Sequence, residues 1–310
     1  MHRAGTRYGR YGLAAWAVIL LCRLDAWRFL LLEFDEVTLD ANLQRRAVLP
    51  FADPRVKRLE SLLLHSTGED KFNFTCGVVD EGIGDAEVTL QWEADVDRAK
   101  KPPGGRGRRP KPKSVEVLFT SPLRDSGLPR PRKHLLLAIP RPSQLERLLP
   151  RVAQMGVGHL ILCGASKVDA NYFRSHVMEL QYLRKFLGLG LAGAEDPMMP
   201  KITVEADLQE LLEGKRLQQI IPGAVSRVVA HPTPLSDGAL FFTLSPDSSP
   251  TTQVLMAIGP EAGWEESELE MFAAADFHAV SLGPRVLRSE VATVAALALA
   301  EQMLIQPALR

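Results

Sequence analysis

From residue 135 onward, short apolar segments alternate with longer segments of helical periodicity, and this alternation constrains the fold more than any other feature. Apolar runs predict buried strands at 135–139, 159–163, 227–230, 240–244, 254–258 and 279–282. Helices are expected at 174–187, 204–212, 265–275 and 290–305, besides one after Ser143. Strands buried on both faces with helices between them indicate a mostly parallel sheet covered on both sides.

The helix after Ser143 carries signals for its start and its end. Ser143 with Glu146 three residues later has the form of a capping box, which predicts Ser143 as the N-cap. Apolar residues then recur at helical spacing, and Gly156 is expected to end the helix. Pro150 lies inside this pattern and predicts a kink.

Residues 25–134 show a different pattern of short strand-like runs, which is typical of a small β-barrel-like domain. Their aromatic and β-branched runs predict strands at 27–32, 72–79, 86–92 and 115–120. The segment 55–65 is helical in periodicity, with its apolar side chains on one face. The sequence thus divides into a β-rich domain at 25–134 and an α/β domain at 135–310.

The charges balance in total but not locally. The chain holds 37 Lys and Arg against 37 Asp and Glu, which excludes a protein that coats nucleic acid by bulk positive charge. Residues 97–113 nevertheless contain eight Lys/Arg, four Pro and three Gly with one acid, so this insertion cannot bury a core. It is either a solvated loop or a basic arm that touches RNA phosphates, with Arg106, Arg108 and Arg109 as candidate contacts.

The cysteines and the first 24 residues narrow the class of protein further. The three cysteines, Cys22, Cys76 and Cys163, are widely spaced, so a disulfide scaffold or zinc ribbon is excluded and no metal is expected. The apolar run 13–22 is too short for a membrane span. Four arginines in residues 1–24 indicate either a targeting segment or a disordered start. We therefore expect a cytoplasmic protein, or a mitochondrial or plastid one if that segment is a targeting signal.

The segment Gly188–Gly193 matches the pattern GxGxxG of dinucleotide-binding proteins letter for letter. That fingerprint requires a strand before it and a helix after it. Here a helical segment precedes it, and Pro197 and Pro200 prevent a helix afterwards. The motif is therefore expected to be a flexible loop, and an oxidoreductase built on it is the weakest of three functional readings.

Two glycine-proline turns follow predicted strands late in the chain, at 259–264 and 283–290. Open α/β sheets bind ligands at the carboxyl ends of their strands. Glycine lets the backbone approach a flat ring closely, and proline makes the turn rigid. Such turns can bind an adenine through main-chain groups, and Arg285, Arg288 and Glu290 place charge beside it.

The two turns together carry a family resemblance. IGPEAGWEESELE at 258–270 followed by LGPRVLRSEVA at 282–292 resembles the RsmE family of SPOUT methyltransferases. The segment Ala230-His231-Pro232 resembles the short HP segment of that family, and Met155-Gly156-Val157 stands at its ELGV position. Residues 29–84 resemble its PUA-like barrel, so the resemblance covers most of residues 27–305.

The resemblance implies a SPOUT-type trefoil-knot methyltransferase domain preceded by a small PUA-like RNA-binding domain, acting as a homodimer. It implies S-adenosylmethionine (AdoMet) as cofactor and methylation of N3 of a uridine in 16S-type small-subunit rRNA, free or within the assembled subunit. The cofactor-binding residues are then expected to be those of the two turns and the preceding strand ends: His231, Ile258, Gly259, Pro260, Glu261, Gly263, Leu282, Gly283 and Leu287.

The same resemblance points to catalytic and RNA-binding groups. Arg288 is expected to stabilise charge on the uracil, Glu290 to orient Arg288 or cap the last helix, and Arg285 to grip phosphate or uracil. Lys167 is the one cation kept in an otherwise arginine-rich family segment. The chain departs from the family at Ala262, where the family has glycine, and at 192–195. The alternative is a member that binds AdoMet and RNA without turnover.

Overall fold

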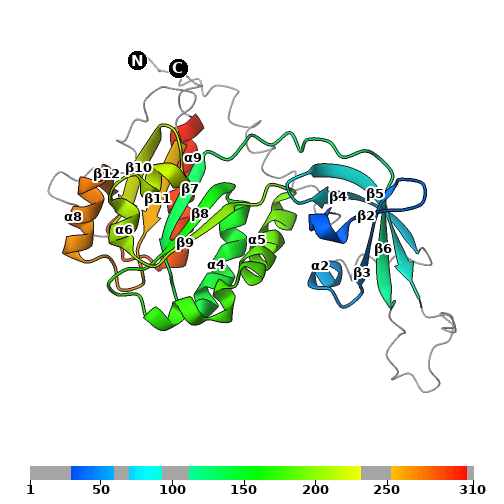
Figure 1. Cartoon of the computed structure of the whole chain (residues 1–310), viewed down its shortest axis with the longest axis horizontal. Coiled ribbons are helices and arrows are strands. Elements are labelled where there is room, and N and C mark those ends of the chain that lie inside the picture. Colours follow the sequence, from blue (N-terminus) through cyan, green and yellow to red (C-terminus); the bar gives the residue numbers. More distant parts are fainter. Residues whose placement is uncertain (1–28, 59–69, 93–111, 232–252, 306–310) are drawn as a thin grey trace, which may run out of the picture. The chain divides into compact units, whose positions relative to one another are not determined.

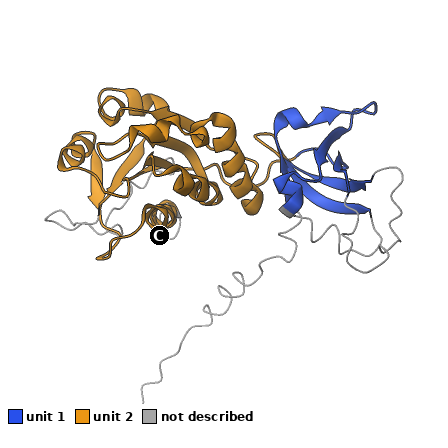
Figure 2. Ribbon diagram, turned by 90° about the horizontal axis from the view of Figure 1, so that it is seen from below, with its two compact units in different colours: residues 1–77, 83–123 blue, residues 78–82, 124–310 orange. Residues whose placement is uncertain are grey.

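The computed structural model describes residues 29–58, 70–92, 112–231 and 253–305. The chain forms two compact units, shown in blue and orange in Figure 2. The first consists of residues up to 77 together with 83–123, and the second of residues 78–82 and 124–310. Residues 124–134, which the sequence division above assigned to the β-rich domain, lie in the second unit.

The first unit is built on one six-stranded sheet in the order β1-β4-β5-β6-β3-β2. Its pairs β2·β3, β3·β6 and β5·β6 are antiparallel. Alternate side chains of β6 are buried, as expected for strands with one face on a core. The strands predicted here are confirmed where the chain is described, whereas closure into a PUA-like barrel stays a prediction. The strands and helices are β1 (Phe29–Leu32), η1 (Phe34–Glu36), β2 (Thr38–Leu39), β3 (Arg45–Pro50), α2 (Pro54–Arg58), β4 (Lys71–Val78), β5 (Gly82–Gln91) and β6 (Ser114–Phe119).

The second unit is the α/β domain that the alternation predicts. Its six strands pair in parallel throughout, in the order β12-β10-β11-β7-β8-β9. Figure 1 shows the sheet between two groups of helices. The strands are β7 (Lys133–Ala138), β8 (Val157–Cys163), β9 (Lys201–Glu205), β10 (Val225–Ala230), β11 (Gln253–Ile258) and β12 (Phe277–Val280). The helices are α4 (Pro142–Gln154), η2 (Ala170–Arg174), η3 (His176–Met178), α5 (Leu180–Ala194), α6 (Leu208–Leu212), α7 (Arg216–Ile220), α8 (Glu266–Ala274) and α9 (Ser289–Ile305).

Alternate residues of the central strands face opposite helix layers. Leu136, Leu255 and Ala257 pack in one cluster with side chains of α6, α7 and α8. On the other side α9 contacts β11 and β7, and α4 contacts both β8 and α9. Both layers exclude water, since Leu135, Leu136 and Leu137 are all fully buried. Cys76 and Cys163 are free and buried, as expected of core thiols, and burial raises the pKa of each.

Several local predictions need correction. Arg141, not Ser143, is the N-cap of α4, because Pro142 occupies the first turn and no side chain caps it. Residues 203–205 continue strand β9, where Val204 pairs with Leu162, so the helix expected at 204–212 begins only at Leu208 behind the Asp207 cap. Residues 174–179 form 3-10 turns rather than the start of a helix. Gly156, at φ +66°, does follow the end of α4 as expected.

The GxGxxG segment is helical and is not the flexible loop expected from its glycines. It lies within α5, which runs to Ala194, so the strand and turn that a dinucleotide fingerprint needs are absent there. Gly190 instead lies against α4. A Cβ on Gly190 would lie 2.1 Å from the Pro150 carbonyl oxygen and 2.8 Å from Ala153 Cβ. This glycine therefore lets two helices approach closely.

Two histidines lie at the opposite end of the sheet from the glycine-proline turns. His134 is hydrogen-bonded through Nε2 to Gln253 at 2.6 Å, and His159 through Nε2 to Thr203 at 2.7 Å. Burial lowers the pKa of His134, and burial together with His134 and Lys201 lowers the pKa of His159 to about 4. Both are therefore neutral at pH 7. Among the described helices none is long and apolar enough to cross a membrane.

Candidate functional site

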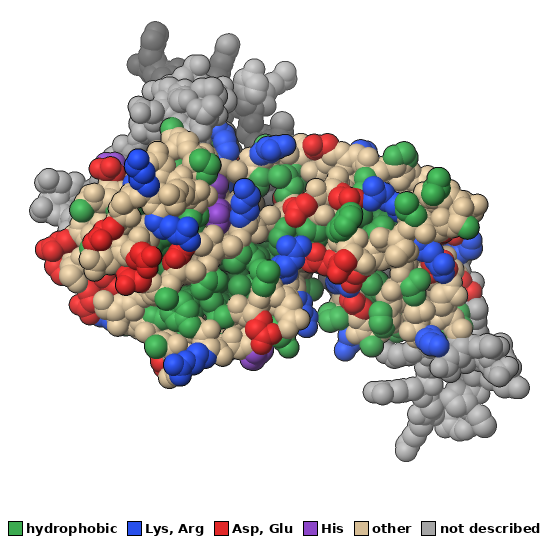
Figure 3. All heavy atoms as spheres, viewed as in Figure 1, with side chains coloured by type: hydrophobic (Ala, Val, Ile, Leu, Met, Phe, Trp, Pro, Cys, Tyr) green, Lys and Arg blue, Asp and Glu red, His purple; other side chains and the backbone are tan. Residues whose placement is uncertain are grey.

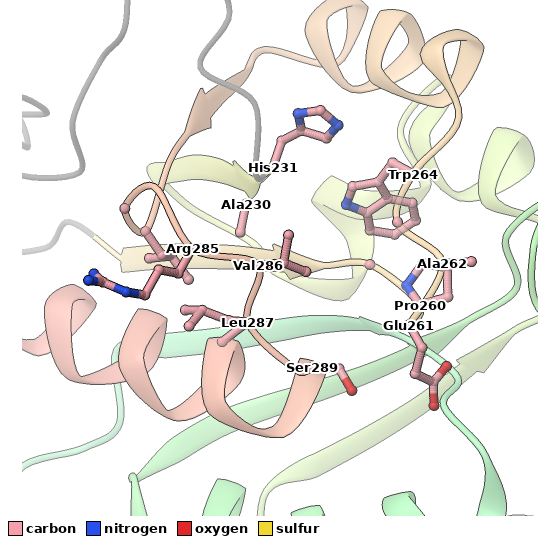
Figure 4. A pocket seen from close by; sticks show the side chains of 15 residues that line it. Ala230, His231, Pro260, Glu261, Ala262, Trp264, Arg285, Val286, Leu287 and Ser289 are labelled. Carbon is pink, nitrogen blue, oxygen red and sulfur yellow. The ribbon is translucent and has the colours of Figure 1, made fainter.

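A pocket opens where β10, β11 and β12 end, between the two glycine-proline turns. Figure 4 shows both turns with the first residues of α9 around it. Its walls combine apolar side chains with backbone of the turns, as a flat, partly apolar ligand requires. The lining residues are Ala230, His231, Gly259, Pro260, Glu261, Ala262, Gly263, Trp264, Leu282, Gly283, Arg285, Val286, Leu287, Ser289 and Ala292.

The first turn is fixed by local hydrogen bonding and by a tryptophan. Gly263 N–H donates to the Pro260 carbonyl at 2.9 Å, and Gly263 adopts φ +74°, which favours glycine. A Cβ on Gly259 would lie 3.1 Å from Trp264 Nε1, so the indole packs directly on the Gly259 backbone. Gly263 is thus required for its backbone conformation, and Gly259 for the close approach of the indole.

The second turn leads into the last helix. Gly283 N–H donates to Ser281 Oγ at 3.2 Å, and Gly283 has φ +116°. The chain then passes through exposed Arg285 and Val286 to Ser289, the first residue of α9. Thr293 Oγ1 donates to the Ser289 carbonyl at 2.7 Å inside this helix. The rim of the pocket on this side therefore combines a cation with an apolar side chain.

A network of charged groups ties the first turn to the loop after β8. Lys167 Nζ donates to the Ala262 carbonyl at 3.3 Å and lies 3.1 Å from Glu265 Oε1. The buried carboxylate of Glu268 accepts from Ser166 N–H and from Glu265 N–H, both at 2.7 Å. Lys167, which was expected to contact RNA, thus links the loop after β8 to the turn at 259–264 in this structure.

The structure brings most of the expected cofactor residues together. His231, Gly259, Pro260, Glu261, Gly263, Leu282, Gly283 and Leu287 line the pocket, and Arg285 joins them. Ile258 does not, because its side chain is buried within β11. Arg106, Arg108 and Arg109 lie outside the described residues.

Arg288 and Glu290 stand beside the pocket rather than in its wall. Arg288 is exposed between the lining residues Leu287 and Ser289. Glu290 lies in the first turn of α9, and its Oε1 is 3.6 Å from Nε of Arg147 on α4. Glu290 thus forms an ion pair with Arg147 of α4.

Five lining residues were missed by the sequence reasoning: Ala230, Trp264, Val286, Ser289 and Ala292. Trp264 lies within the first motif, and Val286, Ser289 and Ala292 lie within the second. Their nearness to the motifs was the available signal. Ala262 also lines the pocket but is not among the described non-glycine residues with positive φ, so its methyl group is accommodated without strain.

The surface around this unit is not uniform in charge. Figure 3 shows acidic side chains gathered over α6 and α8, where Glu210, Glu213, Glu266 and Glu270 are exposed. The pocket itself has one cation, Arg285, and one carboxylate, Glu261, whose Oε1 accepts from Arg141 N–H at 3.3 Å. Among the described residues no three His, Cys, Asp or Glu side chains are grouped to hold a metal ion.

Comparison of the sequence with known proteins finds a family and relatives. The RNA methyltransferase domain family matches residues 128–301. A ribosomal RNA small subunit methyltransferase E of Treponema pallidum is 28% identical over 260 residues, which cover 81% of this chain and 84% of that protein.

Solved structures agree with the fold. The crystal structure of a ribosomal RNA small subunit methyltransferase E from Neisseria gonorrhoeae, bound to S-adenosyl methionine, has a TM-score of 0.61 at 17% identity. A methyltransferase from Legionella pneumophila with bound SAM has a TM-score of 0.62 at 17% identity. Each comparison covers 89% of this chain and 97% of the other. Because the family match spans more than half of the sequence, this chain belongs to the RNA methyltransferase domain family, and its resemblance to the RsmE type is confirmed.

Proposed function

We propose that the protein transfers the methyl group of AdoMet to N3 of one uridine in small-subunit rRNA. The observation that carries this proposal is the pocket, which joins the two RsmE-like turns, distant in sequence, around one cavity. The Treponema pallidum relative and the Neisseria gonorrhoeae neighbour are named as small-subunit rRNA methyltransferases, and both solved neighbours hold S-adenosylmethionine. When bound there, AdoMet supplies an electrophilic methyl group.

The residues present fit such a cofactor. Pro260, Leu282 and Leu287 give apolar walls for an adenine ring, and the glycines let main-chain groups reach its edges. The indole N–H of Trp264 is buried in the wall with no acceptor in the described chain. Exposed Arg285 and Glu261 at the rim suit the charged amino-acid end of the cofactor.

The protein's own contribution to the reaction is position and charge. Methyl transfer is an in-line displacement, so a rigid turn that fixes the direction of attack lowers the barrier. Uridine N3 must lose its proton, and negative charge then spreads onto the uracil carbonyl oxygens. The proposed role of Arg288 is to stabilise that charge, and its exposure between the lining residues Leu287 and Ser289 supports this role. Glu290 holds Arg147 of α4 at the same edge.

The first unit and the basic insertion at 97–113 are proposed to hold the RNA. The PUA-like resemblance and the clustered Lys/Arg of the insertion support this role. The proposal places the protein with small ribosomal subunits in the cytoplasm, or in an organelle if residues 1–24 are a targeting segment.

Nucleoside mass spectrometry tests the function. Small-subunit rRNA from a strain that lacks the gene is expected to lose one 3-methyluridine per subunit, and the wild-type gene should restore it. Unchanged 3-methyluridine excludes this reaction. Calorimetric binding of AdoMet together with unchanged 3-methyluridine would instead favour a non-catalytic member of the family.

A homodimer is part of the proposal, because large apolar side chains are exposed both on the pocket rim and on α9. Val286, on the pocket rim, is 86% exposed, and Val291 on α9 is 53% exposed. The middle of α9, from Val291 to Ala300, is apolar apart from Thr293, although only part of it is buried in the chain. Helices apolar on all sides are normally covered on all sides, and a second copy would cover this face and complete the site.

A charge on this face is expected to separate the dimer. Val291→Asp should convert a dimer into a monomer in size-exclusion chromatography with light scattering, since it buries an unpaired carboxylate in an apolar interface. Val48→Asp is the matched control, because Val48 in β3 is 52% exposed and lies in the first unit. A wild-type protein that is monomeric at micromolar concentration contradicts the dimer.

A further inference from the structure

The first turn of α9 forms one side of the pocket. Ser289 and Ala292 are three residues apart on one face of this helix, and both line the cavity. The Ala292 N–H donates to the Arg288 carbonyl at 2.9 Å, so Arg288 is the N-cap residue. The N–H groups of residues 289–291 precede it and have no acceptor within the helix. The positive end of the α9 dipole therefore lies at the pocket.

Ser289 adds a hydroxyl group that has no hydrogen-bond partner among the described residues. The residue is 7% exposed, and it is the Ser289 carbonyl, not the hydroxyl, that accepts from Thr293 Oγ1 at 2.7 Å. Four other unpartnered side-chain atoms of the described chain are fully enclosed: His134 Nδ1, Gln144 Oε1, Trp264 Nε1 and Glu290 Oε1. Ser289 Oγ is not one of them, so it remains open to the cavity that the residue lines. Because buried hydroxyl groups normally have partners, this one points to a polar ligand.

A carboxylate lies at the same end of the pocket as this hydroxyl group. Figure 4 shows the side chains of Ser289 and Glu261 on the side of the cavity away from His231 and Trp264. Glu261 is exposed, and both residues line the pocket. One end of the cavity thus offers a negative group together with a set of hydrogen-bond donors.

Contacts with α4 agree with this placement. Glu261 Oε1 accepts from the N–H of Arg141, the residue before α4, at 3.3 Å. Glu290 Oε1, one residue beyond Ser289, lies 3.6 Å from Nε of Arg147 in the second turn of α4. Arg147 offsets the charge of Glu290 there. The carboxylate of Glu261 and the start of α9 therefore both lie at the first two turns of α4.

These groups together suit an α-amino acid, which carries an ammonium and a carboxylate on one carbon atom. A carboxylate such as Glu261 pairs with the ammonium group. A hydroxyl donor and free N–H groups at the positive end of a helix suit the carboxylate. An uncharged nucleoside needs neither, and the apolar walls at Pro260 and Leu287 suit it better.

We infer that Ser289 is a specificity-determining residue whose hydroxyl group, with the first N–H groups of α9, binds the carboxylate of the cofactor's methionine moiety. This inference rests on the proposed function and adds to it the group that recognises the amino-acid end. It separates the cofactor and its product from nucleosides of similar shape that lack the carboxylate.

Calorimetry with two ligands tests the inference: S-adenosylhomocysteine, and its decarboxylated analogue, which keeps the nucleoside, the thioether and the ammonium group. Ser289→Ala removes the hydroxyl group at a helix position that alanine favours. It is expected to weaken S-adenosylhomocysteine by about tenfold, the loss typical of a hydrogen bond to a charged group, and the analogue by no more than about twofold. Ser143→Ala is the matched control, since Ser143 is exposed in the first turn of α4 and caps nothing, and it should bind both ligands as the wild type does.

A second measurement does not depend on the folding of the variant. The wild-type protein should bind the decarboxylated analogue at least about tenfold more weakly than S-adenosylhomocysteine, because the analogue loses both the hydroxyl and the N–H partners. If Ser289→Ala does not fold, as judged by circular dichroism, this comparison decides alone.

Three results overturn the inference while the proposed function stands: a folded Ser289→Ala that binds S-adenosylhomocysteine as the wild type does, an equal loss for both ligands, or a wild-type protein that binds both ligands equally well. If the wild-type protein binds neither ligand, the proposed function fails and this inference fails with it.

Discussion

Replacing Arg288 with alanine is expected to lower kcat by about 100-fold or more while AdoMet affinity stays within a few-fold of wild type. Removal of one donor aimed at developing negative charge typically costs 10² to 10³ in rate. Arg288 lies beside the pocket but not in its wall, so its loss should spare the cofactor. Single-turnover methylation of a small-subunit rRNA fragment and calorimetry with S-adenosylhomocysteine measure the two effects separately.

Two further arginines make this test specific. Arg285 lines the pocket, so Arg285→Ala should weaken cofactor binding, unlike the Arg288 change. Arg151 is exposed on α4 and donates through Nη1 to the Arg147 carbonyl at 2.9 Å, and Arg151→Ala should leave both quantities unchanged. If Arg288→Ala retains full turnover, or loses affinity as much as rate, the assigned role is wrong.

The parallel sheet and the position of the pocket could be predicted from the sequence, because both depend on local patterns. Apolar runs and helical spacing predicted the parallel sheet, and the glycine-proline turns predicted which strand ends carry the pocket. Such local patterns predict the path of the backbone. They do not predict contacts between side chains that are distant in sequence.

Lys167 and Glu290 illustrate the limit. Lys167 was expected to contact RNA, and Glu290 was expected to orient Arg288 or to cap the last helix. The motifs could not show that the fold also brings each of them to a partner distant in sequence. Lys167 meets Ala262 and Glu265 from a loop far away in sequence, and Glu290 meets Arg147 of α4. Trp264 was missed for the same reason, since its orphaned N–H is visible only when the neighbouring strands are in place.

The GxGxxG segment gives the clearest case of a pattern whose meaning depends on its neighbours, and it predicts a large effect on stability. Gly190→Ala is expected to destabilise the second unit by about 3 kcal/mol, at the upper end of the usual cost of overpacking. A Cβ there would lie 2.1 Å from the Pro150 carbonyl oxygen, so α4 and α5 must move apart. Urea unfolding followed by circular dichroism measures the loss.

Gly188→Ala is the matched control in the same helix. Nothing lies within 4 Å of a Cβ at Gly188, so alanine there should stabilise the helix by about 0.5–1 kcal/mol through its higher propensity. Opposite signs at two glycines two residues apart would show that helix packing, not a nucleotide, requires the motif. Equal effects at both positions would contradict the close approach of α5 to α4, because only Gly190 lies against Pro150.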